Sequence, residues 1–111
     1  MDTPAEWRDL IEKLLTEETL VPVSYGEIAV HTVFDRAQDH YLLMAVGWDG
    51  TKRVHAPLIH VDLIDGKVWI QHDGTERGIA RDLEAAGVSK DRIVLAFQHM
   101  SRRRFGDYAA A

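Results

Sequence analysis

The hydrophobic positions follow two different periods along the chain, and the change of period separates the predicted elements. Close to the start, apolar residues recur at helical spacing, at Trp7, Leu10, Ile11, Leu14 and Leu15. One apolar stripe of this kind predicts an amphipathic helix over residues 4–20. Thr3 can serve as its N-cap, Pro4 suits the first helical position, and Glu6 completes a capping box.

From residue 27 onward the period is two, which is typical of strands. Ile28, Val30, Thr32 and Phe34 alternate with outward positions and predict a first strand over residues 27–34. A second strand over residues 41–48 follows, and the pair Asp49-Gly50 turns it into a third that begins near residue 52. A loop of two residues and one of three with a bulge both fit that turn. Pro57 cannot donate to a ladder, so it marks a bulge, a bend or an edge position.

The pair Asp65-Gly66 predicts a tight hairpin, because it lies between two runs rich in β-branched and aromatic residues. A two-residue loop fixes the register of the third and fourth strands. On one face the expected pairs are Leu63 with Val68, Val61 with Ile70, and Ile59 with His72. On the other face they are Asp62 with Trp69 and His60 with Gln71.

After the fourth strand, a polar loop at residues 72–76 leads into a second helix over residues 76–86, with Thr75 as its expected cap. Gly87 fits a left-handed helix ending, with Val88 packing back on Leu83. A fifth strand follows at residues 93–97, and the order strand, helix, strand indicates a crossover. The pattern therefore predicts one α+β domain over residues 1–111, an antiparallel sheet of about four strands plus a fifth, with two helices packed on it.

Composition narrows the functional classes. The 111 residues are 46% hydrophobic and 28% charged, as in an ordinary globular protein, and no cysteine is present for disulfide or thiolate chemistry. A formal charge of −5 argues against a general binder of phosphate backbones. No apolar run is long enough to span a membrane, and the acidic start is not typical of a signal peptide, so we expect a cytoplasmic protein.

Several segments are similar to a known family. SYGEI at residues 24–28, VGWDG at 46–50 and WIQHDGTE at 69–76 are the most specific, within a likeness that runs over nearly the whole chain. They resemble the XisI family, the fdxN element excision controlling factors typical of cyanobacteria. The chain departs from the family pattern at Ala56-Pro57, and at His72, where glutamine is as frequent.

The resemblance implies a role rather than a chemistry. XisI proteins are associated with a DNA rearrangement, the excision of an element during heterocyst differentiation, together with a recombinase and a companion called XisH. XisH resembles restriction-endonuclease-type proteins. The resemblance therefore implies a regulatory or accessory protein that binds an XisH-like partner.

The histidines and acidic residues are the first candidates for catalysis or metal binding. On the predicted register His60 and His72 point to opposite faces, and His55 lies beyond the end of the ladder, so no shared metal site is expected. His72, Asp73 and Glu76 offer an alternative as a small metal-dependent enzyme site. A turn and a helix start account for the same residues, and no nucleophile–base pair or cofactor motif is present. We therefore expect no catalytic, cofactor or metal site.

The aromatic residues Trp48, Trp69 and Tyr41 are the candidates for an interface. One of the two tryptophans is expected beneath the first helix and the other at a binding surface. The predicted partner-binding residues are Trp69 with a polar, acidic surround: Asp62, Gln71, Asp73 and Glu76. Such a surface suits a basic partner that handles nucleic acid better than DNA itself. Exposed strand edges further predict a homodimer.

Arg102, Arg103 and Arg104 form the one basic run of the sequence, next to Phe105. They could contact phosphate or an acidic partner, which is the basis of an alternative as a DNA-binding accessory factor. A solvated tail is the simpler interpretation, so DNA contact is expected to be indirect or weak.

Overall fold

The structure is a computed structural model that describes residues 2–111. Its order is α1 (Pro4–Glu18), β1 (Glu27–Asp35), β2 (His40–Asp49), β3 (Lys52–Ile64), β4 (Lys67–Asp73), α2 (Ile79–Ala85), β5 (Ile93–Leu95) and α3 (Met100–Arg103), with a 3₁₀ turn η1 (Lys90–Arg92) before β5. One sheet holds the strands in the order β1-β2-β3-β4-β5, with β5 parallel to β4 and the other pairs antiparallel. The predicted α+β class and the crossover are confirmed.

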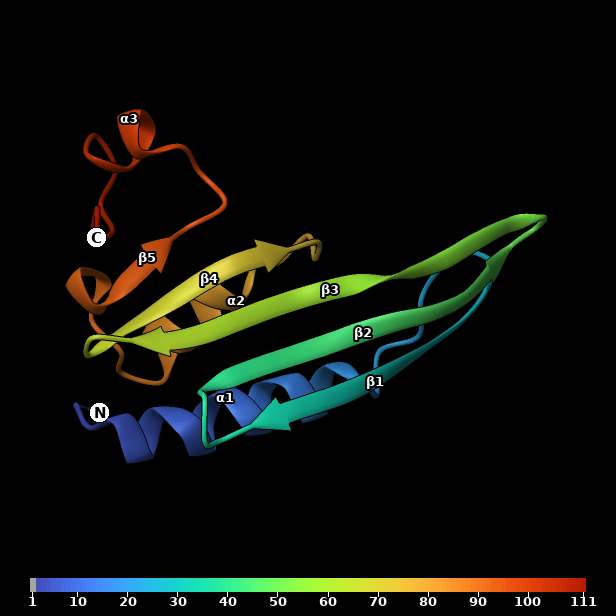
Figure 1. Cartoon of the computed structure of the whole chain (residues 1–111), viewed down its shortest axis with the longest axis horizontal. Helices are drawn as coiled ribbons and strands as arrows, with labels where there is room; N and C mark the ends of the chain where they lie inside the picture. Colours follow the sequence, from blue (N-terminus) through green and yellow to red (C-terminus); the bar gives the residue numbers. More distant parts are fainter. Residues whose placement is uncertain (1) are drawn as a thin grey trace.

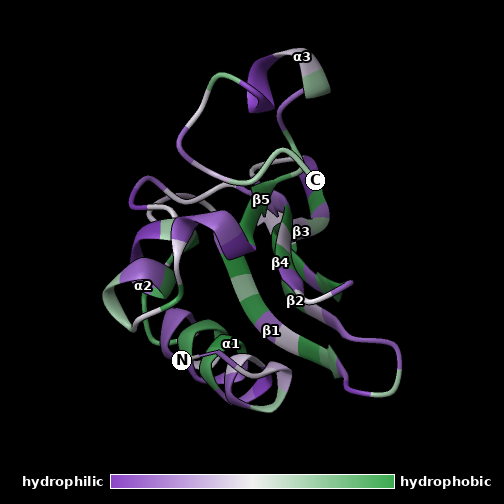
Figure 2. Ribbon diagram, turned by 90° about the vertical axis from the view of Figure 1, so that its left-hand side faces the viewer, coloured by the Kyte–Doolittle hydropathy of each residue, from purple (hydrophilic) through white to green (hydrophobic). Residues whose placement is uncertain are grey.

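Both helices α1 and α2 lie on one face of the sheet, as Figures 1 and 2 show. The core between these helices and the sheet is apolar. Its fully buried residues include Ile11 and Leu15 of α1, Leu43 of β2, Val61 of β3 and Leu83 of α2. Burial of such side chains stabilises the fold by about 1.5–3 kcal/mol each. We call the opposite side of the sheet the outer face.

The turns follow the local sequence signals. Asp65 and Gly66 both have positive φ, 50° and 73°, as a type I′ hairpin requires. Asp49 pairs with Lys52, so the β2–β3 loop contains two residues, and Gly50 at φ 62° takes the first central position. The capped start of α1 is also confirmed, since the Thr3 side chain accepts from the Glu6 N–H.

One β-bulge changes the predicted register of β3 and β4, and a second lies between β2 and β3, whose register the sequence left open. The pairs Leu63–Val68, Val61–Ile70 and Asp62–Trp69 are confirmed, but the register then shifts between His60 and Val61. His60 therefore pairs with His72, and Ile59 with Asp73, so both predicted pairs at this end were wrong. A second shift lies beside Pro57, which pairs with Met44, and confirms the irregularity that proline indicated.

The second helix begins later than predicted. It starts at Ile79 instead of residue 76, because its N-cap is Gly78 with φ 83°, a conformation that ends any helix running back toward Glu76. Its end is as expected: Gly87 has φ 105°, and the Val88 N–H donates to the Leu83 carbonyl at 3.0 Å. The helix α1 ends at Glu18, and β5 ends at Leu95, each two residues short of the prediction.

Candidate functional site

Most of the histidines lie on the outer face of the sheet. Along β2 the buried residues Tyr41, Leu43 and Ala45 point to the helices, so the residues between them point outward. By the strand register, five of the six histidines lie on this outer face: His31, His40, His55, His60 and His72.

Asp62 is the centre of a compact polar cluster on the outer face. Its Oδ1 lies 2.8 Å from His40 Nδ1 and 2.8 Å from His60 Nε2. Its Oδ2 accepts from Gln71 Nε2 at 3.2 Å. Among residues 2–111 this is the one group of three His or acidic residues whose ligand-type atoms all lie within 4.8 Å of one another.

The strand geometry explains why these side chains meet. His60 and Asp62 are two residues apart on β3 and so project from the same face, and His40 lies directly opposite Asp62 on β2. Gln71 occupies the β-bulge on β4, which leaves it without a partner in the register and turns it toward Asp62.

The electrostatics of the cluster depend on the histidines. Asp62 is only 6% exposed, and it is the sole charged residue among the buried residues of the described chain. No lysine or arginine pairs with it there. The hydrogen bond that Asp62 accepts from His40 is the largest cause that raises the pKa of His40, followed by the charge of the carboxylate.

Trp69 lies on the outer face as predicted, but a different element covers it. Arg103 places its guanidinium 5.7 Å from the centre of the Trp69 ring, and β5, through Val94, pairs with the Trp69 backbone. The indole Nε1 is buried and has no hydrogen-bond partner within residues 2–111. The expectation that α1 covers one of Trp48 and Trp69 was wrong, because both lie on the outer face and it is the C-terminal segment that covers Trp69.

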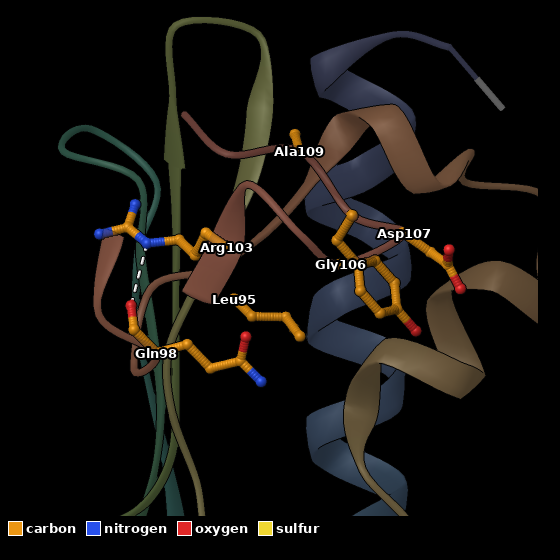
Figure 3. Close-up of a pocket in the computed structure, with 7 residues that line it drawn as sticks. Leu95, Gln98, Arg103, Gly106, Asp107 and Ala109 are labelled. Atoms are coloured by element: carbon orange, nitrogen blue, oxygen red, sulfur yellow. Dashed lines mark hydrogen bonds between the residues drawn. The ribbon is translucent and has the colours of Figure 1, made fainter. Parts of the chain in front are cut away.

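Arg103 is held in place within that C-terminal segment. Its Nε donates to the Gln98 carbonyl at 2.9 Å, as Figure 3 shows, and its guanidinium also donates to the Ala110 carbonyl at 2.9 Å. A small pocket of about 180 Å³ remains between Leu95, Arg103 and Tyr108. Arg104 stacks on Phe105, and Arg102 is exposed. The three arginines thus do not form one open basic surface.

Trp48 is the tryptophan that stays accessible. It is 50% exposed near the β2–β3 turn, with the Arg53 guanidinium 5.2 Å from its ring centre. Tyr41, the third aromatic candidate, is completely buried and donates its hydroxyl to Asp39. Tyr41 therefore belongs to the core, and the interface prediction for it was wrong.

Asp73 lies at the end of β4 and Glu76 in the loop that follows it, and neither belongs to the Asp62 cluster. Asp73 Oδ1 accepts from the Thr75 N–H, and its Oδ2 accepts from the Ile79 N–H at 2.6 Å, so this carboxylate caps α2. Glu76 is exposed and lines a cleft of about 500 Å³ together with Glu18 and Tyr25. Burial, then the charges of Asp82 and Asp73, raises the pKa of Glu18.

The five predicted partner-binding residues are therefore divided. Asp62, Trp69 and Gln71 share the outer face, whereas Asp73 ends β4 and Glu76 lies in the loop before α2. The sequence pattern placed His60 and Asp62 on one face but missed His40, because the histidine stands at the very start of β2. A His-x-Asp pair within a predicted strand was the signal that could have found this cluster.

The comparisons with known proteins agree with one another. The family model described as "XisI protein" matches residues 1–110. The chain belongs to the XisI family. Its XisI fold is similar to that of a XisI-like protein from Anabaena variabilis ATCC 29413, with a TM-score of 0.87 and 36% identity over 96% of this chain and 98% of that one.

A second solved structure carries a functional name. It is the fdxN element excision controlling factor XisI, also from Anabaena variabilis ATCC 29413, with a TM-score of 0.82 and 29% identity. The alignment covers 96% of this XisI-family chain and 97% of that chain. A comparison with curated protein sequences finds no match. Within residues 2–111, no helix combines the length and apolar character needed to cross a membrane.

Proposed function

We propose that this XisI-family protein controls DNA-element excision by binding another protein, an XisH-like partner of nuclease fold, and that it has no catalytic activity of its own. The name of the Anabaena variabilis excision controlling factor supports the excision role. The formal charge of −5 supports a protein partner, because it would repel the phosphates of DNA and attract a basic, DNA-handling protein.

The observation that carries this proposal is an apolar region of the outer face that no helix covers. Val33 and Trp48 are each 50% exposed there, and Leu42 and Met44 are partly exposed between them. In Figure 2 both α1 and α2 lie on the other side of the sheet. Exposed apolar regions with polar margins are typical of protein interfaces.

Trp48 takes the anchoring role that the sequence suggested for Trp69. The exposed half of its indole offers a large, rigid apolar contact, whereas the Trp69 indole is already occupied by Arg103. The neighbours of Trp48 in the strand register carry both signs of charge, Glu27 on β1 and Arg53 on β3, so the charge argument for a basic partner rests on the net charge of −5 of the whole chain.

Co-purification with a tagged XisH-like protein tests the proposal. Trp48→Ala is expected to weaken binding by about 2 kcal/mol, close to thirtyfold, if the indole sits at the centre of the interface. Phe105→Ala is the matched control, because Phe105 is an aromatic residue that is 81% exposed outside the outer face. Circular dichroism establishes that each variant is folded.

Two results would overturn the proposal. Folded Trp48→Ala protein that retains the partner as well as wild type does would exclude this surface. Wild type that binds duplex DNA at physiological salt, but no XisH-like protein, would favour the DNA-binding alternative. In that case neutralising Arg102 and Arg104 should abolish the complex and reduce its salt dependence.

A further inference from the structure

The buried carboxylate of Asp62 lacks a permanent cation. Its hydrogen-bond partners in the described chain are two imidazoles and one amide, and none of these carries a fixed positive charge. A buried carboxylate is costly unless it is paired or coordinates a metal. Here the burial is nearly complete, since the Asp62 side chain is 9% exposed.

The donor atoms around Asp62 match the ligands of one class of ion. Two imidazole nitrogens and one carboxylate oxygen form a set that suits first-row transition metals, whereas Mg²⁺ and Ca²⁺ are bound through oxygen atoms. Two histidines and one carboxylate with a remaining open position occur in Zn²⁺ sites, and the same ligand set binds Fe(II) in non-haem oxygenases.

We propose that His40, His60 and Asp62 bind a divalent transition-metal ion, and Zn²⁺ is the ion with which the site is tested. This site is independent of the partner-binding proposal, since it involves neither Trp48 nor Val33. It rests on the convergence of three ligands from β2 and β3 on one point of the outer face.

The three ligand atoms lie within 4.8 Å of one another, which is close enough for a single ion to be placed among them. Metal–ligand bonds of about 2.0–2.1 Å in a tetrahedral site place ligand atoms about 3.3 Å apart. The nitrogens of His40 and His60 each lie 2.8 Å from the Asp62 oxygen, so the rings must move outward by about half an ångström each. The His40 side chain is 46% exposed and has room to do so.

The surroundings supply the two further features of a metal site. Gln71 holds the other Asp62 oxygen, and hydrogen bonds of this kind fix the orientation of a ligating carboxylate. The partial exposure of both histidines, 46% and 27% for their side chains, leaves a path for the ion and a position for a water ligand.

Metal content and affinity test the site directly. Apo protein prepared with a chelator is titrated with Zn²⁺ by calorimetry, and Co²⁺ is used as a spectroscopic probe of the ligand set. Wild type is expected to bind one Zn²⁺ per chain and to give the intense visible absorption of four-coordinate Co²⁺. Each of His40→Ala, His60→Ala and Asp62→Asn should weaken the affinity at least tenfold.

The other histidines of the outer face provide matched controls. His31→Ala and His55→Ala remove exposed imidazoles that lie outside the cluster, and they should leave affinity and spectrum unchanged. Because Asp62→Asn alters a buried group, circular dichroism accompanies it, and the exposed His40 ring provides a variant that does not disturb the core. Zn²⁺ should also raise the melting temperature of wild type but not of His40→Ala.

Three outcomes would overturn the inference. The first is wild-type protein that takes up no stoichiometric Zn²⁺. His31→Ala or His55→Ala could lose as much affinity as the cluster variants, which would indicate adsorption by scattered surface histidines. Folded His40→Ala and His60→Ala protein could also retain wild-type affinity.

Discussion

Three aspartates of this chain have three different structural roles, each set by the groups around it. Asp39 receives two hydrogen bonds from the Arg8 guanidinium, which hold its pKa below the usual range. Asp62 faces two histidines, and Asp73 accepts backbone N–H groups at the start of α2. At the scale of residues, the partner of a carboxylate decides whether it supports a turn, a helix or a possible ligand site.

The helix cap formed by Asp73 leads to a stability prediction. Asp73→Ala removes the acceptor of the Thr75 and Ile79 N–H groups and should lower the free energy of unfolding by about 2 kcal/mol. Glu76→Ala, an exposed residue of the same loop, should change it by less than about 0.5 kcal/mol. Urea denaturation measures both, and equal losses would contradict the capping role.

Tyr108 gives a prediction that depends on pH. Its hydroxyl donates to Glu84 Oε2 at 2.6 Å, and this bond, together with burial, raises the pKa of Tyr108 to about 12. The unfolded value is about 10, so the stabilisation is complete below pH 10 and is lost as the pH rises toward 12.

Tyr108→Phe should therefore be less stable than wild type by about 1 kcal/mol near pH 8. The difference in stability should shrink steadily as the pH rises above 10, because wild type then loses the hydrogen bond from the Tyr108 hydroxyl to Glu84, which the variant lacks at every pH. Denaturant titrations at a series of pH values measure it, and a difference that is constant up to pH 12 would contradict the assignment.

At the scale of elements, the signals that are local in sequence were the reliable ones. The Asp65-Gly66 turn, the capped start of α1 and the Schellman ending at Gly87 each depend on a few adjacent residues, and all three are confirmed. The β-bulge at Gln71 depends on how β3 and β4 fit together over their length, and no pattern of adjacent residues predicts it. The predicted positions of His60 and His72 failed for that reason.

The close approach of β1 and β2 at Gly47 leaves no space for a side chain at that position. A Cβ on Gly47 would lie 2.0 Å from the Glu27 carbonyl oxygen of β1, so the two strands could not stay at their present separation. Gly47→Ala should lower the free energy of unfolding by about 3 kcal/mol, at the upper end for overpacking.

Gly50 is the matched control for that substitution. Its φ is 62°, but nothing lies within 4 Å of an added Cβ, and asparagine tolerates this conformation. Gly50→Asn should therefore be nearly neutral. Thermal unfolding of the two variants compares a strand contact with a turn, and similar losses would contradict the steric argument.

At the scale of the whole molecule, the two edges of the sheet differ. The β5 edge carries a bridge between Val94 and Ala109 of the C-terminal segment, whereas the β1 edge ends the strand order without a neighbour in the described chain. An open edge of nine residues is suited to pairing with a second copy about a two-fold axis.

We propose that the homodimer predicted from the sequence forms through the β1 edge. Light scattering at high micromolar concentration should give twice the 12.6 kDa mass of the chain. A monomer mass under those conditions would contradict the prediction. Retained dimerisation in Trp48→Ala protein would separate this contact from the partner surface on the outer face.

The global arrangement was predictable where it follows from chain order. Consecutive hairpins place β1 to β4 side by side, and a helix between strands requires the crossover that makes β5 parallel. The path of residues 96–110 back over Trp69 could not be predicted from the sequence. It depends on contacts of Arg103 with the Trp69 ring and with two backbone carbonyls, and no sequence pattern indicates such contacts.

The hairpin of β2 and β3 extends well beyond the helices in Figure 1, and this gives its amide protons two time scales of exchange with solvent. Amides near the Asp65-Gly66 end, over the core, should exchange only when the whole domain opens. Those near Gly50 should exchange by local fraying, many times faster, although the same ladder runs through both. A protein that binds beside Trp48 would then be detected as a slowing of the fast amides alone.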